Sequence, residues 1–160
     1  AGYITLDEIR PAMLQMQSWG LVVRIGQKKR KRDGTFGGSD AERLADLQQL
    51  LNDRSVKAIM CARGGYGMVR IIDRLNFNEM RRHPKWLIGF SDVTVLHAHL
   101  NRTVKIDSIH SKMCNSFPDT WEQAEPIQQE TILSIRDSLF GKPLSFTVPP
   151  NPANRFGKAR

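Results

Sequence analysis

Short apolar, β-branched runs alternate along the chain with stretches in which apolar residues recur every three or four positions. This alternation predicts βα units, in which helices connect parallel strands and cover both faces of the sheet. Strands are predicted at Leu21–Ile25, Val56–Cys61, Trp86–Phe90 and, as a fourth, Val104–Ile106. The expected fold class is therefore α/β, a parallel sheet flanked by helices.

Capping signals and helical periodicity predict the helices between these strands. Ser39 and Glu42 have the spacing of a capping box, and apolar residues follow on one helical face at positions 44, 47, 50 and 51. Other helical stretches are expected at about Asp7 or Glu8 to Trp19, Met68 to Leu75, Ser91 to about Leu100 and about Pro126 to Leu139. Pro11 argues against an earlier start of the first helix, because proline inside a helix removes a hydrogen bond.

A glycine-rich segment, Arg63-Gly64-Gly65-Tyr66-Gly67, follows the second predicted strand. Ligands of parallel sheets bind beyond the carboxyl ends of the strands. Three glycines there let backbone N–H groups approach an anion, and a following helix would add positive potential. The dinucleotide pattern fails because Arg70 stands where its last glycine belongs, and the phosphate-loop pattern fails as well. Two interpretations stay open, an oxyanion or carboxylate cradle with Arg63 as a clamp, and a purely structural turn.

The segment Gly89-Phe90-Ser91-Asp92 follows the third predicted strand and resembles a nucleophile elbow, although Val93 replaces the second glycine of that pattern. In such an elbow a sharp turn exposes a serine hydroxyl above the sheet. The alternative is that Ser91 only caps the following helix. A serine nucleophile also needs a base, usually histidine. We expect His83 on a surface loop, His97 and His99 in packing or surface roles, and His110 at a strand end near the site, and none of the four makes a convincing triad.

Composition narrows the function classes. The chain has 160 residues and a formal charge of +8, of which five positive charges lie in Lys28–Arg32. That run contains no aromatic residue and is flanked by turn signals, so a solvated loop is favoured over nucleic-acid binding. Cys61 and Cys114 are too few for a disulfide scaffold and have no metal-binding spacing, which favours a reducing compartment. No apolar run reaches the roughly 18 residues that a membrane span needs.

Taken together, these motifs resemble the LD-carboxypeptidase family of serine peptidases, which includes muramoyltetrapeptide carboxypeptidases and microcin C immunity peptidases. The residues that carry the resemblance are Ala58–Gly67, Pro84-Lys85, Ile88–Thr94 and His110, with Ser39–Leu47 upstream. The likeness extends in family order over the whole chain. It implies a flavodoxin- or Rossmann-like N-terminal domain, cytoplasmic cell-wall recycling, no metal and no cofactor.

The resemblance also assigns roles to individual residues. Ser91 would be the nucleophile, and the N–H groups of Asp92 and of Gly64 or Gly65 would form the oxyanion hole. The substrate would be a murein tetrapeptide, cleaved at an L,D-peptide bond to release its terminal D-alanine. The residues expected to contact this substrate are Arg63, Tyr66 and His110. Neither a nucleic acid nor a membrane is an expected partner, and a homodimer is expected for the full-length protein.

The family's triad Glu and His lie in a C-terminal domain, and its first strand precedes the position of Ala1-Gly2. We therefore expect residues 1–145 to form the nucleophile-bearing domain and residues 146–160, which include Pro149-Pro150, to be a linker to a domain absent from this chain. On this interpretation the chain alone is inactive. The alternatives are a microcin C immunity-type peptidase and a non-catalytic α/β module that binds an anion.

Overall fold

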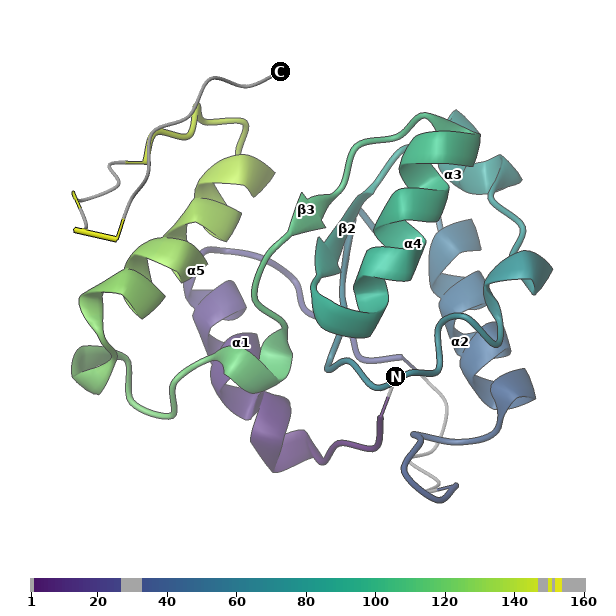
Figure 1. The fold of residues 1–160 in the computed structure, drawn as a ribbon, viewed down its shortest axis with the longest axis horizontal. Coiled ribbons are helices and arrows are strands. Elements are labelled where there is room, and N and C mark those ends of the chain that lie inside the picture. The colour runs from purple at the N-terminus through teal and green to yellow at the C-terminus, as the bar shows by residue number, and fades with distance from the viewer. Residues whose placement is uncertain (1, 27–32, 147–149, 151, 154–160) are drawn as a thin grey trace.

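The computed structural model describes residues 2–26, 33–146, 150 and 152–153. At its centre, β1 (Ala58–Met60), β2 (Trp86–Gly89) and β3 (Ile109–His110) form a sheet in that order, and both neighbouring pairs are parallel. Helices flank this sheet (Figure 1). The predicted α/β class is confirmed, and the carboxyl ends of the three strands meet at one edge.

Helices cover both faces of the sheet. One face packs on α1 (Leu6–Ser18) and α5 (Pro126–Leu139), and the other on α2 (Asp40–Asn52), α3 (Asn78–Arg82) and α4 (Thr94–His99) (Figure 1). Consecutive residues of β2 face opposite ways, so Leu87 lies in the cluster with α2 and α4, and Ile88 lies in the cluster with α1 and α5. Burial on both sides explains why this strand is a continuous apolar run in the sequence.

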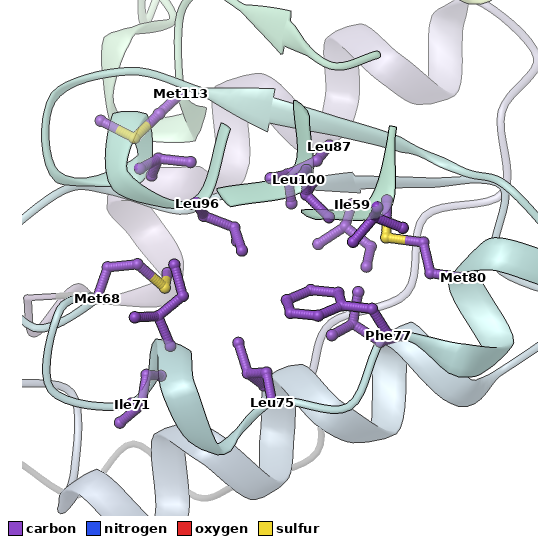
Figure 2. Close-up of a cluster of buried hydrophobic side chains, with 14 residues drawn as sticks. Ile59, Met68, Ile71, Leu75, Phe77, Met80, Leu87, Leu96, Leu100 and Met113 are labelled. Atoms are coloured by element: carbon purple, nitrogen blue, oxygen red, sulfur yellow. The ribbon is translucent and has the colours of Figure 1, made fainter. Parts of the chain in front are cut away.

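The larger cluster fills the space between the sheet and α2 to α4. Figure 2 shows Ile59 and Leu87 from the strands on one side of it and Leu75 and Phe77, from the segment before α3, on the other. Leu87 and Leu96 are fully buried. Burial of each such leucine contributes about 2 kcal/mol relative to leaving it in water, so this cluster fixes where β2 ends and α4 begins.

Two capping boxes set the starts of the long N-terminal helices. The predicted one, between Ser39 and Glu42, is present at the start of α2. A second, between Thr5 and Glu8, starts α1 at Leu6, earlier than predicted. Pro11 therefore lies inside α1. The capping box and the burial of Ile9 and Ala12 stabilise this helix, although Pro11 removes one intrahelical hydrogen bond.

Two predicted strands are absent from these positions. Residues 21–25 are irregular and pair with no described strand, and Val22 is exposed, because apolar β-branched residues form a strand only where a neighbouring edge accepts their hydrogen bonds. Val104 instead ends a π-helical turn, Leu100–Val104, that continues α4. The Val104 side chain is buried in the larger core cluster. Lys105 then takes a left-handed conformation, and the third strand begins at Ile109.

The predicted helix from Met68 to Leu75 is also wrong. Only a 3₁₀ turn, Ile72–Arg74, forms there. Ile72 and Leu75 are buried as their spacing suggested, but Val69 is 62% exposed, so the apolar positions do not share one helical face.

Among the described helices, none is both long and apolar enough to cross a membrane.

Candidate functional site

Ser91 stands in the sharp turn between β2 and α4. β2 ends at Gly89, Phe90 is extended, and Ser91 has a φ of 58°, the left-handed conformation that few non-glycine residues adopt. The 3₁₀ turn Ser91–Val93 then leads into α4. The side chain of Ser91 is exposed and makes no capping hydrogen bond, so the alternative that it merely caps the helix is wrong.

The glycine-rich turn lies directly against this serine. A Cβ atom on Gly64 would lie 3.2 Å from Ser91 Oγ and 3.6 Å from the backbone nitrogen of Asp92. The N–H groups of Gly64, Gly65 and Asp92 donate to no acceptor within the part of the chain that the structure describes. The two motifs, separate in the sequence, thus meet at the carboxyl edge of the sheet and leave unpaired backbone donors close to a serine hydroxyl.

The Asp92 carboxylate joins the two motifs. Its Oδ2 accepts hydrogen bonds from the N–H groups of Gly67 and Met68, both at 3.0 Å. No helix begins at Met68, so the expected helix N-terminus open to an outside anion is absent, and the amides in its place are already occupied by a carboxylate of the protein itself. The sequence motif placed Asp92 beside the nucleophile but gave no sign of this second role for its side chain.

Arg43, on the inner side of α2, holds the same turn from the opposite direction. Its guanidinium is buried, with 8% exposure, and Nη1 donates to the Gly67 carbonyl at 2.9 Å. It also pairs with Asp40 and lies over the Phe36 ring at 4.7 Å. A Cβ atom on Gly67 would overlap Nη1 in its present position, so any other residue here would force the buried guanidinium to shift. Sequence reasoning missed Arg43, although a charged residue among the apolar positions of α2 was a signal.

The three predicted substrate contacts also lie at this edge, without bonds to Ser91. The Arg63 Nη1 donates to the Tyr3 carbonyl at 3.0 Å, which directs the guanidinium toward the N-terminal segment. Tyr66 is 88% exposed and has a φ of 41°, so its ring projects into solvent from the glycine turn. His110 is exposed at the end of β3, where it pairs in register with Gly89.

No histidine serves Ser91 as a base within the described residues, which include all four. Both ring nitrogens of His97 lie 2.7 and 2.9 Å from other groups, and its side chain is buried. Burial lowers the pKa of His97; the hydrogen bond to Gly89 partly offsets this effect, and the neighbouring His110 reinforces it. His99 packs against an aromatic ring, and His83 is exposed where α3 ends. The expected packing and surface roles of these three are confirmed.

The two thiols are unsuited to nucleophilic chemistry. Burial raises the pKa of Cys61 to about 11 and that of Cys114 to about 12, so both stay protonated near neutral pH. Within the described part of the chain, no group of three or more His, Cys, Asp or Glu side chains has the geometry to hold a metal ion. Neither thiol therefore competes with Ser91 as the candidate nucleophile at this edge.

A parallel sheet with an exposed, left-handed serine beyond a strand end has the arrangement of a nucleophile elbow on an α/β fold. Comparison with known sequences identifies the family: residues 1–111 match the LD-carboxypeptidase N-terminal domain family, and this chain belongs to it.

The similar proteins are longer than this chain. The probable murein peptide carboxypeptidase of Bacillus subtilis is 34% identical over 145 residues, which are 86% of this chain and 45% of that protein. The murein tetrapeptide carboxypeptidase of Pseudomonas aeruginosa is 27% identical over 136 residues, 84% of this chain and 44% of that protein. The chain thus spans less than half the length of these relatives.

Solved structures show the same fold. The muramoyltetrapeptide carboxypeptidase of Oxalobacter formigenes superposes with a TM-score of 0.69 at 22% identity, over 86% of this chain and 45% of that one. The microcin C7 self-immunity protein MccF, solved with aspartyl sulfamoyl adenosine, superposes with a TM-score of 0.75 at 21% identity, over 89% of this chain and 43% of that one.

Proposed function

We propose that this chain supplies the nucleophile and the oxyanion donors of a serine carboxypeptidase that hydrolyses an L,D-peptide bond and releases the terminal D-alanine of a murein tetrapeptide. The observation that carries the proposal is the exposed, left-handed Ser91 lying against Gly64. The names of the Bacillus and Pseudomonas relatives support the substrate class.

In this proposal Ser91 Oγ attacks the carbonyl carbon of the scissile bond. The oxyanion that forms accepts hydrogen bonds from the N–H of Asp92 and from that of Gly64 or Gly65, which have no other described acceptor. Each donor of this kind contributes about 3 kcal/mol to transition-state stabilisation. The Asp92 carboxylate keeps the glycine turn in place while its own N–H faces the substrate. When the intermediate collapses, the C–N bond breaks and D-alanine leaves with the proton that the base took from Ser91. A water molecule then hydrolyses the acyl-enzyme and restores the Ser91 hydroxyl.

The base that activates Ser91 comes from outside these 160 residues. We infer a Glu and a His in the part of the relatives that this chain does not span, so the chain alone is inactive. The division into a domain at 1–145 and a linker at 146–160 remains a prediction, and most of the linker lies outside the described residues. Binding of the peptide by Arg63, Tyr66 and His110, the cytoplasmic location and the homodimer also remain predictions.

Release of D-alanine from a murein tetrapeptide tests this function. The polypeptide encoded by the complete reading frame should release D-alanine, and Ser91→Ala should lower kcat by at least 1,000-fold, since the hydroxyl forms the covalent intermediate. Thr94→Ala, at the exposed first residue of α4 three positions after Ser91, is the matched control and should keep activity. The 160-residue chain should show no turnover above its Ser91→Ala variant. Turnover by the chain alone, or undiminished turnover by Ser91→Ala, would contradict the proposal.

Two other functions are distinguishable in the same assays. The fold of MccF makes an acyl-sulfamoyl nucleotide a second substrate to test, and hydrolysis of aspartyl sulfamoyl adenosine with no release of D-alanine would favour an immunity-type peptidase. An anion-binding module without catalysis would have to use other donors than the N–H groups of Gly67 and Met68, because the Asp92 carboxylate occupies both. Nucleic-acid binding by Lys28–Arg32 concerns residues outside the described ranges.

A further inference from the structure

His97 connects three elements around the serine turn. It lies on α4, and its Nε2 is 2.9 Å from the carbonyl oxygen of Gly89, the last residue of β2. Its Nδ1 is 2.7 Å from the hydroxyl of Ser108, which precedes β3. The same Gly89 oxygen accepts the N–H of Ser111, just beyond β3, at 3.1 Å. The His97 imidazole thus links α4, which follows Ser91, to the end of β2 and to Ser108, just before β3.

The chemistry of these partners assigns the state of the ring. A carbonyl oxygen only accepts hydrogen bonds, so Nε2 must carry a proton. In the neutral ring Nδ1 is then an acceptor, and the Ser108 hydroxyl donates to it. The side chain is 8% exposed, and burial disfavours the charged form. Both nitrogens are engaged, which leaves neither available to take a proton from Ser91.

From this network we propose that His97 is a positioning residue, which holds the carbonyl of Gly89 and thereby fixes the left-handed turn at Ser91. This inference rests on the proposed role of Ser91 as nucleophile. Ser91 is only two residues beyond Gly89, and its left-handed conformation is intrinsically unfavourable, so surrounding contacts must impose it. A Gly89 carbonyl held from two sides cannot rotate to relax the turn.

Two substitutions of similar size separate positioning from packing. His97→Gln retains an N–H donor for Gly89 and an oxygen acceptor for Ser108, whereas His97→Leu fills the space without either bond. In the complete enzyme we expect His97→Leu to lower kcat 10- to 100-fold with little change in KM, as a small displacement of a reacting group does, and His97→Gln to stay within about threefold of wild type. His99→Leu, the same change two residues further along α4, is the control and should keep kcat.

Ser108→Ala covers the case in which His97→Leu fails to fold. Ser108→Ala leaves the His97 ring in place but removes the hydroxyl that donates to Nδ1, and it should lower kcat at least threefold. A readout independent of activity uses the 160-residue chain: nitrogen chemical shifts of the His97 ring should show the neutral Nε2–H form at pH 7. The proposal is overturned if the ring is an imidazolium or carries its proton on Nδ1, or if Leu and Gln variants have equal kcat. Undiminished turnover by Ser91→Ala would instead overturn the proposed function. The nitrogen chemical shifts would still show whether His97 donates to the Gly89 carbonyl.

Discussion

Three glycines around the serine turn each lie close to a different neighbouring side chain. A Cβ on Gly64 would crowd Ser91, one on Gly67 would strike Arg43, and one on Gly89 would lie about 3 Å from Val93. The sequence showed that these segments are unusually rich in glycine and that Ser91 follows a strand. It could not show which side chains fill the space, because the contacts join residues up to 27 positions apart and depend on the tertiary fold.

The contact of Gly67 with Arg43 gives a test at the scale of one residue. Gly67→Ala should destabilise the chain by about 2 to 3 kcal/mol, because the buried guanidinium is held by Asp40 and cannot move away freely. Urea unfolding measures the loss. Gly20→Ala is the control, since its left-handed position has open space around it and should cost only about 1 kcal/mol.

A double variant checks the cause of this loss. Combining Gly67→Ala with Arg43→Met removes the group that the new methyl would strike, so the two losses should not add. Strict additivity of the two free-energy changes would show that Arg43 is not what excludes a side chain at position 67.

His97 predicts a pH dependence of stability. Its pKa in the folded chain is below the ordinary value of 6.5 because of burial, so the unfolded chain binds the proton more readily. The stability contributed by the neutral ring is therefore present above pH 6.5 and is lost as the pH falls below it. His110, 5.7 Å away between ring centroids, adds to the cost of protonating His97.

Urea unfolding at pH 7.5 and pH 5.5 measures this dependence. The free energy of unfolding should fall between these two values by more in wild type than in His97→Gln, which has no proton to gain at that position. An equal fall in both proteins would show that His97 titrates alike in the folded and unfolded chains.

At the scale of elements, a complete capping box and a continuous apolar run were reliable signals, whereas apolar spacing alone, as at Met68–Leu75, and signals that depend on a partner strand were not. The capping box at Ser39 and the apolar run of β2 are complete within a few residues, and both were predicted. A strand needs a neighbouring edge, and the apolar residues at 21–25 have none among the described strands. The contacts that the Asp92 carboxylate and the Arg43 guanidinium make with the glycine turn escaped prediction for the same reason, since each joins residues about 25 positions apart.

Lys85 joins two elements and gives a test at this scale. Its side chain is 4% exposed, and Nζ donates to the carbonyls of Leu50 and Asp53 at the end of α2, at 3.0 and 2.7 Å. Burial lowers the pKa of Lys85, and the negative end of the helix dipole favours its charge. Lys85→Met should lower the free energy of unfolding by about 2 kcal/mol, since it leaves both carbonyls unpaired.

Thermal and urea unfolding measure this effect, and Lys57→Met, at an exposed position nearby, is the matched control. Equal stability of the two variants would show that the contacts of Lys85 with α2 contribute nothing measurable.

At the scale of the whole molecule, the described residues supply a candidate nucleophile and backbone donors but no histidine in contact with the nucleophile. The serine, the unpaired backbone donors and the clamps that hold them gather at the carboxyl edge of the sheet, while no described histidine reaches Ser91. The chain spans 45% of its Bacillus relative, which supports the proposal that the general base lies in the remainder. Sequence resemblance suggested that the nucleophile and its base lie in different parts of the protein. The geometry of residues 63–67 and 89–92 is consistent with the nucleophile's half of that proposal.

Covalent labelling tests the central claim most directly, namely that Ser91 is the nucleophile. The polypeptide of the complete reading frame is treated with a fluorophosphonate, digested with trypsin and analysed by mass spectrometry. The peptide Trp86–Arg102 contains Ser91 as its only serine, so the site of reaction is unambiguous. We predict a single adduct on this peptide, absent from Ser91→Ala and retained in Thr94→Ala. An adduct on a different serine, or an unmodified Ser91 in an enzyme that releases D-alanine, would contradict the account.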